Sequence, residues 1–322
     1  MSTSPSPPGR ELVVQRRYAS ARQTVAFELA NADGLALPDW APGSHIDVVL
    51  PLANGELVRQ YSLCGPVDNA RLWRIVVHRE RHGRGGSAYL CDQLVEGQRL
   101  YVRGPRNNFP FVPSPRLTLL AGGIGITALL PMVAAAQDAG CDWRLLYLAR
   151  SQADMSLLDE ICRLPPERVT LHCSADRGRL DLAAWTRTLG PEEAVFACGP
   201  LRLLDDLESL HDHTARWQLH LERFENPNFA QGEHRAFEVV LARSGRSVRV
   251  NSEESILDAL LREGLALDCS CREGVCGSCE QRVLQGVPDH RDAVLTADER
   301  RQNTHMMICV SRATTPTIML DL

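Results

Sequence analysis

Cys271-Arg-Glu-Gly-Val-Cys276-Gly-Ser-Cys279 places three cysteines in the spacing C-x4-C-x2-C, and Cys309 follows in the same part of the chain. This is the plant-type spacing of four thiolates around a [2Fe–2S] cluster. Gly274 and Gly277 suit a loop that must bring backbone N–H groups against sulfur atoms, since such loops often need positive φ. The motif therefore predicts an iron–sulfur domain with these four cysteines as ligands.

A structural zinc site and buried, inert thiols are the alternative interpretations of these cysteines. Zinc sites usually draw their ligands as two short pairs, whereas this pattern is three plus one. Cys269 lies two residues before the first predicted ligand and is interpreted as an additional thiol. The remaining scattered cysteines are expected to be core residues: Cys64, Cys91, Cys141, Cys162 and Cys173.

A hairpin and a helix are predicted immediately before the cysteine-rich loop. Phe237–Ala242 and Ser247–Val250 are the expected strands, around the turn Arg243-Ser-Gly-Arg246. The helix is predicted over Ser252–Glu263, with Asn251 and Glu254 in the spacing of a capping box and Gly264 as its end. Upstream, the polar stretch Phe224–Glu233 contains Asn-Pro and Gly and is predicted to be a linker between domains.

The middle of the chain alternates apolar strands with helices. This pattern predicts a parallel sheet that is covered on both faces, which is a nucleotide-binding type of architecture. The expected strands are Leu117–Ala121, Arg144–Ala149, Val169–Cys173 and Ala194–Cys198, and the expected helices are Thr127–Ala139, Ser156–Arg163, Leu182–Thr188 and Leu201–Ser209.

Two loops in this region follow predicted strands. Ala121-Gly-Gly-Ile-Gly-Ile-Thr127 opens a helix, so its glycines can let a pyrophosphate approach the backbone amides. Cys198-Gly-Pro200 stands at the corresponding end of a later strand. Because ligands bind at the carboxyl ends of parallel strands, the two loops together predict a dinucleotide site, although neither is the G-x-G-x-x-G fingerprint.

The first hundred or so residues predict a small antiparallel barrel. The expected strands are Gln23–Leu29, Ser44–Leu50, Glu56–Ser62, Trp73–Arg79 and Arg99–Arg103, with one helix at Ser87–Leu94 capped by Ser87. Arg59-Gln-Tyr-Ser-Leu63 closes one strand with a cation, an aromatic ring and a hydroxyl, and Gly83-Arg-Gly-Gly-Ser87 is a possible anion cradle. The two segments together suggest a flavin phosphate site, and a plain exposed strand is the alternative.

Composition narrows the function classes. A formal net charge of −5 argues against a broad nucleic-acid-binding surface, and all 35 basic residues are Arg, so Schiff-base chemistry on Lys is excluded. The first ten residues lack the apolar core of a signal peptide, which favours a cytoplasmic protein. Leu117–Ala136 is apolar but carries Gly, Pro and Thr in a strand–turn–helix pattern, so no membrane span is expected.

The chain resembles the phthalate dioxygenase reductase family, which includes vanillate O-demethylase reductases. The resemblance rests on three features in this order: R-x-Y-S-L with G-R-G-G-S, then G-G-I-G-I-T with C-G-P, and then the cysteine motif. The resemblance implies a multidomain fold. Its parts would be an FMN-binding antiparallel β-barrel (8–112), an NAD(P)-binding α/β domain with a parallel sheet (113–224), a linker (225–235) and an α+β domain of the β-grasp ferredoxin type (236–322).

The resemblance also assigns roles to individual residues. Arg59, Tyr61, Ser62 and Leu63 would lie along the flavin, with Ser62 near its N5, and Gly85, Gly86 and Ser87 would hold the flavin phosphate, a pattern that goes with FMN rather than FAD. Gly122, Gly123, Gly125 and Thr127 would face the NADH pyrophosphate, Cys198, Gly199 and Pro200 the nicotinamide, and Phe224 the flavin ring. Arg150 stands where an acidic residue would favour a free ribose 2′-hydroxyl, so NADPH is not excluded.

The implied function is the reductase component of a Rieske-type oxygenase system, in which electrons pass from NADH through FMN and [2Fe–2S] to a terminal oxygenase that acts on an aromatic acid or ether. The contact with the oxygenase is expected to be transient, and one chain suffices for the electron path, so a monomer is expected. A cytochrome P450 or a separate ferredoxin is the alternative acceptor. A redox-sensing protein is a further alternative, but the sequence shows no basic recognition helix and no spare domain for an effector.

Overall fold

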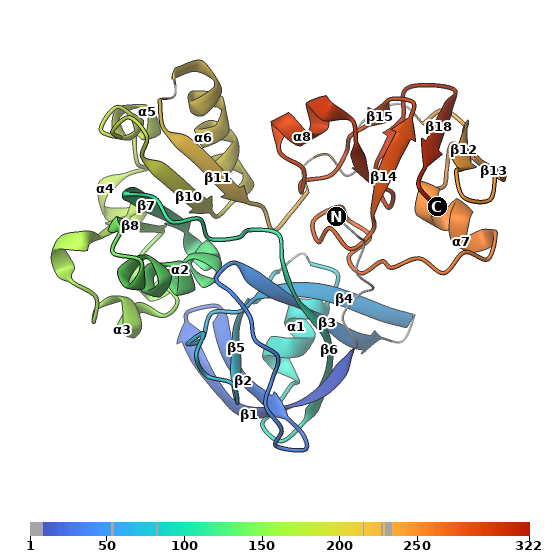
Figure 1. The fold of residues 1–322 in the computed structure, drawn as a ribbon. Helices are drawn as coiled ribbons and strands as arrows, with labels where there is room; N and C mark the ends of the chain where they lie inside the picture. The colour runs from blue at the N-terminus through green and yellow to red at the C-terminus, as the bar shows by residue number, and fades with distance from the viewer. Residues whose placement is uncertain (1–8, 53–54, 82, 215, 227, 229–233) are drawn as a thin grey trace. The chain divides into compact units, whose positions relative to one another are not determined.

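The computed structural model describes residues 9–322 except 53–54, 82, 215, 227 and 229–233. The chain divides into two compact units, one ending at Glu222 and the other formed by Arg223–Leu322. The first unit contains two sheets, a six-stranded antiparallel sheet followed by a five-stranded parallel one (Figure 1). The predicted barrel and the predicted α/β domain therefore lie within one unit. Several residues of the predicted linker fall outside the described part of the chain.

The antiparallel sheet has the strand order β4-β3-β6-β1-β2-β5. Its strands are β1 (Arg10–Ala21), β2 (Thr24–Asn31), β3 (Ser44–Leu52), β4 (Gly55–Ser62), β5 (Trp73–His78) and β6 (Arg99–Asn107), and helix α1 (Gly86–Asp92) follows β5. The edge strands β4 and β5 also contact each other, so the sheet is rolled into a barrel. Inward-facing apolar side chains, such as Phe27, Ile46, Leu50 and Ile75, fill its core. Strand β1 was not predicted.

The parallel sheet has the order β11-β10-β7-β8-β9. Its strands are β7 (Arg116–Gly122), β8 (Asp142–Ala149), β9 (Val169–Cys173), β10 (Ala194–Cys198) and β11 (Gln218–Glu222), and its longer helices are α2 (Ile126–Asp138) and α6 (Leu201–Thr214). Short helices α3 (Leu158–Ile161), α4 (Ser174–Arg177) and α5 (Leu182–Thr186) complete it, with single turns at Gly123–Gly125, Gln152–Asp154 and Pro166–Arg168. The prediction of this sheet is confirmed, except that β11 and α4 were missed.

Side chains of each central strand alternate between two apolar layers. On β7, Leu117 and Leu119 pack with α2, whereas Leu120 belongs to the layer that contains Leu204 and Leu207 of α6. Helices on both sides of the sheet are visible in Figure 1. This double burial explains why the strands are continuously apolar in sequence.

The apolar stretch Leu117–Ala136 divides into strand β7, a tight turn and the first part of α2, as its Gly and Thr content predicted. Within the described residues, no helix has the length and apolar character that crossing a membrane requires.

Polar contacts join the barrel to the parallel-sheet region within the first unit. The guanidinium of Arg74, on β5, donates to both carboxylate oxygens of Glu160 on α3, at 2.6 and 2.8 Å. The hydroxyls of Thr24 and Ser156 lie 2.9 Å apart, and the Leu157 backbone N–H donates to the Ser20 hydroxyl. The Arg74 side chain is nearly buried, so its charge depends on Glu160 for a partner.

Removing this partner is expected to weaken the junction. Glu160→Gln should lower stability by about 1 kcal/mol, less than for a fully buried pair because the Glu160 side chain is more than a third exposed. Thermal unfolding of the purified protein measures the effect. Glu167→Gln, an exposed carboxylate in the same region, serves as the matched control and should leave the midpoint unchanged. Equal midpoints for the two variants would contradict a stabilising role for the pair.

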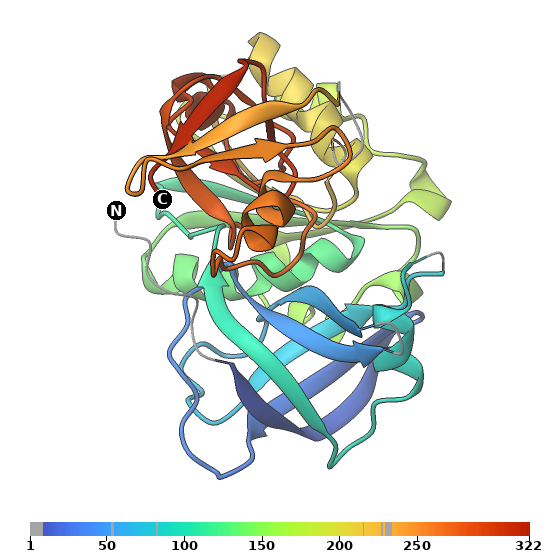
Figure 2. The same ribbon diagram turned by 90° about the vertical axis from the view of Figure 1, so that its right-hand side faces the viewer.

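The second unit is built on the mixed sheet β13-β12-β18-β14-β16. Its elements are β12 (Phe237–Leu241), β13 (Ser247–Val250), α7 (Ile256–Arg262), β14 (Glu280–Gln285), β15 (Pro288–Asp289), α8 (Ala297–Gln302), β16 (His305–Met307), β17 (Arg312–Ala313) and β18 (Thr317–Leu320). In Figure 2, α7, drawn in orange, lies against the strands of this sheet. The arrangement agrees with the predicted α+β domain.

The start of α7 differs from its prediction. The helix begins at Ile256, with the Ser255 hydroxyl accepting from the Asp258 backbone N–H, so Ser255 is the N-cap. Asn251 and Glu254 are hydrogen bonded, but in the turn before the helix. The predicted end is confirmed, since Gly264 follows the helix with φ of 82°. Ser255 caps the helix in place of Asn251 because its hydroxyl accepts directly from a backbone N–H of the first turn.

Candidate functional site

The loops after β7 and β10 meet at the topological switch point of the parallel sheet. Chain order runs outward from β7 through β8 and β9, and then returns to place β10 on the other side of β7. The strands are in register, with Ala121 opposite Cys198. Crevices at such switch points, at the carboxyl ends of the strands, are where ligands bind in open α/β sheets.

The glycines of these two loops allow an unusually close approach. A Cβ on Gly125 would lie 2.1 Å from the Cys198 carbonyl oxygen, and a Cβ on Gly199 would lie 2.9 Å from the Gly122 Cα. Gly123 differs, because its φ is 55° and no atom lies within 4 Å of a Cβ built there. Gly125 and Gly199 therefore let the two loops pack against each other, whereas the backbone at Gly123 faces open space.

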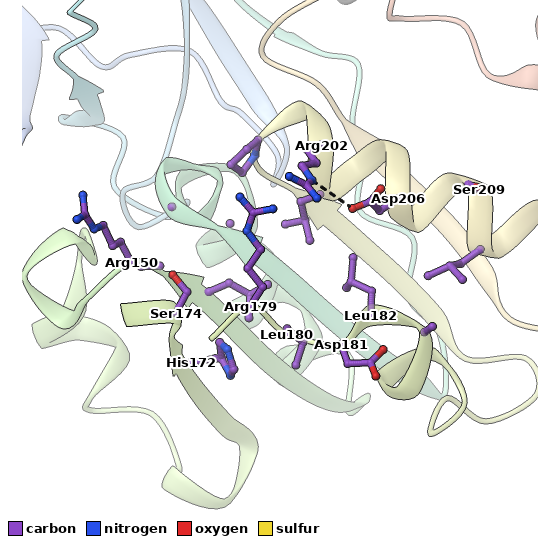
Figure 3. A pocket seen from close by; sticks show the side chains of 18 residues that line it. Arg150, His172, Ser174, Arg179, Leu180, Asp181, Leu182, Arg202, Asp206 and Ser209 are labelled. Carbon is purple, nitrogen blue, oxygen red and sulfur yellow. Dashed lines mark ion pairs between the residues drawn. The ribbon is translucent and has the colours of Figure 1, made fainter. Parts of the chain in front are cut away.

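A cavity of about 770 Å³ opens beside these loops (Figure 3). It is lined by Gly122, Gly123, Leu148, Ala149, Arg150, His172, Ser174, Arg179, Leu180, Asp181, Leu182, Ala183, Pro200, Arg202, Leu203, Asp206, Ser209 and Leu210. Four residues predicted to bind the dinucleotide are among them: Gly122, Gly123, Arg150 and Pro200. The cavity runs from the switch point to the ends of β8 and β9, as an extended dinucleotide requires.

Other predicted dinucleotide residues lie behind this surface. Thr127 is buried and its hydroxyl donates to the Ile124 carbonyl, 2.9 Å away. Cys198 is completely buried. Neither side chain lines the cavity, nor do Gly125 and Gly199. A direct role of these residues toward a nucleotide stays a prediction.

Glu222, at the end of β11, is a residue that the sequence did not reveal. It stands opposite Cys198 in the parallel register, and its carboxyl lies within hydrogen-bonding reach of the Cys198 thiol. Its Oε2 is buried and, among the described residues, has no hydrogen-bond partner. Burial raises the pKa of Glu222 to about 8, so the carboxyl holds a proton at neutral pH. The register that pairs β10 with β11 could not be predicted, because β11 was missed.

Stability should therefore depend on pH through Glu222. Because its pKa is higher in the folded than in the unfolded protein, the folded state binds more protons between pH 4.5 and about 8, and stability falls as pH rises through this window. Glu222→Gln should remove this fall and stabilise the protein at pH 8 by more than about 1.4 kcal/mol, the equivalent of one pKa unit. Unfolding midpoints at pH 5 and pH 8, with Glu167→Gln as control, measure it. A parallel pH dependence in both variants would exclude Glu222 as its source.

The two segments predicted to bind a flavin come together in the barrel. A Cβ on Gly86, at the start of α1, would lie 3.0 Å from Cγ of Arg59 on β4. Gly85 has φ of 93° and no atom lies within 4 Å of a Cβ built there. The Gly-rich turn and the Arg59–Leu63 strand, which are separate in sequence, thus form one surface.

Buried polar atoms without partners mark the same region. Ser62 on β4 stands opposite His45 on β3, so their side chains share a face of the sheet. The Ser62 Oγ and the His45 Nε2 are both buried and, within the described part of the chain, neither has a hydrogen-bond partner. Burial lowers the pKa of His45 to about 3, so its ring is neutral. Since unpaired buried polar groups are costly, these atoms fit a site for a polar ligand such as a flavin ring.

Three of the predicted flavin residues are less available than expected. Ser87 does not cap α1, because the N-cap is Gly85 and the Ser87 hydroxyl accepts from the Glu80 backbone N–H at 3.0 Å. The Leu63 side chain is fully buried in the barrel core, so only its main chain could meet a ligand. Tyr61 is also largely packed against that core, and burial raises the pKa of its hydroxyl.

The four predicted cluster ligands converge in the second unit. Cys276 and Cys279 are almost completely buried, and Cys271 and Cys309 nearly so. The thiol of Cys309 lies within hydrogen-bonding reach of those of Cys271 and Cys279, and the thiol of Cys271 within reach of that of Cys276. The antiparallel pairing of Glu280 with Met307 brings the last two ligands together.

The four converging thiols are the ligand set that a [2Fe–2S] cluster requires. A zinc site requires four ligands around one ion, whereas a [2Fe–2S] cluster distributes four thiolates over two irons. Cys269 also lies within hydrogen-bonding reach of Cys309, so it is an additional thiol close to the ligands.

The backbone of the cysteine loop is shaped for sulfur contacts. Arg272, Gly274 and Gly277 have φ of 56°, 70° and 69°, and the Glu273 backbone N–H donates to the Cys271 sulfur at 3.3 Å. Asn226 holds the loop from outside, donating through Nδ2 to the carbonyl oxygens of Glu273 and Arg291. This residue lies in the predicted linker, so that segment has a structural role toward the loop.

Phe224 belongs to the second unit and is exposed, with 39% of its surface accessible. Its predicted position against the flavin ring stays a prediction.

Two protein families match this chain, one in its C-terminal part and one in its N-terminal part. Residues 239–314 match the family described as 2Fe-2S iron-sulfur cluster binding domain, and residues 11–111 match the oxidoreductase FAD-binding domain. The first match contains all four predicted ligands, and the second contains the barrel segment in which Ser62 and His45 lie.

Individual relatives cover almost the whole chain. A toluene-4-sulfonate monooxygenase system reductase subunit from Comamonas testosteroni is 38% identical over 94% of this chain and 96% of its own. The structure of phthalate dioxygenase reductase, described as modular for electron transfer from pyridine nucleotides to [2Fe–2S], matches with a TM-score of 0.69 and 34% identity over 98% of both chains. An intact type IV self-sufficient cytochrome P450 monooxygenase matches with a TM-score of 0.89 and 36% identity, over 98% of this chain and 41% of that one. The chain therefore belongs to the phthalate dioxygenase reductase family of flavin and iron–sulfur oxidoreductases.

Proposed function

We propose that this protein transfers electrons from a reduced pyridine dinucleotide, through FMN, to a [2Fe–2S] cluster and then to a separate Rieske-type oxygenase. The observation that carries the proposal is the convergence of four buried cysteines in one unit, together with a dinucleotide-sized cavity at the switch point of the other. When bound, the flavin converts a two-electron donor into single electrons for the cluster.

The residues of the chain contribute position rather than acid–base chemistry. Gly123 leaves the backbone open to a pyrophosphate in the turn before α2, and Gly122 and Pro200 line the same cavity. Ser62 and His45 offer unpaired polar atoms to the flavin ring. Because Glu222 is protonated, it places no negative charge beside Cys198, the residue predicted to lie at the nicotinamide. Cys271, Cys276, Cys279 and Cys309 hold the cluster.

FMN rather than FAD follows from the resemblance of the Arg59–Leu63 and Gly83–Ser87 segments to FMN-containing family members. Release of the flavin by acid, followed by chromatography against FMN and FAD standards, tests this choice. FMN in a one-to-one ratio to protein is the expected result. FAD would overturn the assignment without affecting the cluster ligands.

An oxygenase is the proposed acceptor because the matched relatives are named as subunits or reductases of oxygenase systems. The match to part of a self-sufficient cytochrome P450 supports a P450 as the second candidate acceptor. Purified Rieske oxygenase components and P450s, each mixed with the reductase and its reduced dinucleotide, distinguish them. Turnover with a Rieske component is expected, and turnover with P450s alone would overturn the first choice. The same relay requires only one chain, so we propose a monomer, which sedimentation can test.

The rim of the cysteine loop is the expected contact for the acceptor. Arg272 lies next to a ligand and is exposed, with its guanidinium donating to Asp258 at 2.7 Å. Arg272→Gln should slow electron delivery to the oxygenase roughly tenfold, because removing a charge from an interface slows association with the partner. Dinucleotide-dependent ferricyanide reduction should be unchanged. Arg243→Gln, an exposed arginine on the hairpin of the same unit, is the control. Equal losses in both assays would overturn the interface assignment.

A further inference from the structure

The far end of the cavity carries positive charge where the adenosine ribose of a dinucleotide would lie. In open α/β folds, the residue after the second strand reads the ribose, and an acidic residue there favours a free 2′-hydroxyl. Here β8 is followed by Arg150, which lines the cavity. Arg150 can therefore bind an anion such as a 2′-phosphate, but it cannot accept a hydrogen bond from a ribose 2′-hydroxyl.

A second arginine reaches the same cavity from the segment after β9. Ser174 is the first residue of the short helix α4, and Gly178 after this helix, with φ of 70°, turns the chain so that Arg179 also lines the cavity. The His172 Nε2 donates to the Gly178 carbonyl at 2.8 Å, which fixes the return of the loop. In Figure 3, the Ser174 side chain lies between those of Arg150 and Arg179.

These donors are not used by the rest of the protein. Within the described part of the chain, no hydrogen bond or ion pair engages the guanidinium of Arg150 or Arg179, or the hydroxyl of Ser174.

The two carboxylates of the cavity, in contrast, already have partners. Asp181 accepts from the Ala184 backbone N–H as the N-cap of α5. Asp206 lies 3.9 Å from the Arg202 guanidinium. Neither carboxylate directly follows β8, where an acidic residue would accept from a ribose 2′-hydroxyl.

We propose that Arg150, Ser174 and Arg179 form a subsite for the 2′-phosphate of NADPH, and that the protein consequently prefers NADPH to NADH. Two guanidinium groups and a hydroxyl match a dianionic phosphate, because charge-assisted hydrogen bonds to phosphate are strong and arginine offers several donors. The inference rests on the proposed function, in which this cavity binds the pyridine dinucleotide.

Calorimetric titration of the holoprotein with 2′,5′-ADP and with 5′-AMP isolates the 2′-phosphate from the rest of the dinucleotide. We expect 2′,5′-ADP to bind roughly tenfold to a hundredfold more tightly than 5′-AMP. Arg150→Gln and Arg179→Gln should each reduce this ratio, and the double variant should abolish it, while affinity for 5′-AMP is retained. The kcat/KM ratio of NADPH to NADH should fall in parallel.

Arg177→Gln is the matched control, because Arg177 is an exposed arginine at the end of α4, two residues before Arg179, and does not line the cavity. It removes the same charge and should leave the ratio nearly unchanged. Equal affinity of the wild type for both nucleotides, or an equal effect of Arg177→Gln and Arg179→Gln, would overturn the subsite. If NADH reduces the flavin as well as NADPH does, only the subsite fails, whereas reduction by neither dinucleotide would overturn the proposed function as well.

Discussion

Replacing Cys309 with alanine is expected to eliminate the iron–sulfur cluster and to reduce electron delivery to protein acceptors to background. Its thiol lies within reach of those of Cys271 and Cys279, so its removal leaves one iron with an incomplete set of ligands. Iron content, the visible absorption of the cluster and the EPR signal of the reduced protein should disappear together. Ferricyanide reduction by the dinucleotide should persist, because the candidate flavin site lies in the other unit.

Cys269→Ala is the matched control for this variant. Cys269 is in the same loop and within hydrogen-bonding reach of Cys309, but it lies outside the C-x4-C-x2-C spacing. We expect it to retain the cluster with near-normal iron content. Loss of the cluster in Cys269→Ala, with retention in Cys309→Ala, would show that the fourth ligand has been wrongly assigned.

Gly125→Ala is expected to have the largest effect on the first unit. The new Cβ would lie 2.1 Å from the Cys198 carbonyl oxygen and 2.8 Å from the Gly199 backbone nitrogen, and backbone atoms cannot move aside as a flexible side chain can. The loops after β7 and β10 must separate, so we expect a loss of about 3 kcal/mol in stability and a severe loss of dinucleotide binding. Chemical unfolding and titration with 2′,5′-ADP measure the two effects.

Gly140→Ala provides the comparison. Gly140 has φ of 68° and open space around a Cβ, so alanine there costs only the left-handed backbone conformation, about 1–2 kcal/mol, and dinucleotide binding should be normal. A Gly125→Ala variant with unchanged dinucleotide affinity would refute the idea that close loop packing shapes the switch point.

The predicted elements succeed where one physical signal dominates. The strand Ala194–Cys198 has the predicted bounds because it is buried along its whole length, and such strands are recognisable from their continuous apolar composition. The edge strand Val169–Cys173 also has the predicted bounds, although only Cys173 is buried. Strand β1 was missed because Arg16 and Arg17 interrupt its apolar alternation. Strand β11 was missed because Gln218–Glu222 mixes polar and apolar residues.

The candidate site was predictable to a similar degree. Cysteine spacing alone identified the thiols that the fold brings together, since loop geometry constrains ligand spacing directly. Ser174 and Arg179 could not be assigned to the cavity, because their placement depends on the reversal at Gly178. His45 was missed because it becomes a neighbour of Ser62 only through the β3–β4 register. The glycines of the β7 loop were predicted correctly as a loop before a helix, but Gly125 contacts backbone where a pyrophosphate was expected.

The most direct test of the electron path is an anaerobic titration of the purified protein with NADPH, followed by absorption and EPR spectroscopy. We predict that flavin and iron–sulfur bands bleach together and that the reduced protein gives the rhombic EPR signal of a [2Fe–2S] cluster. Bleaching of the flavin without any cluster signal, even after addition of dithionite, would contradict the assignment of Cys271, Cys276, Cys279 and Cys309 and leave a simple flavin reductase.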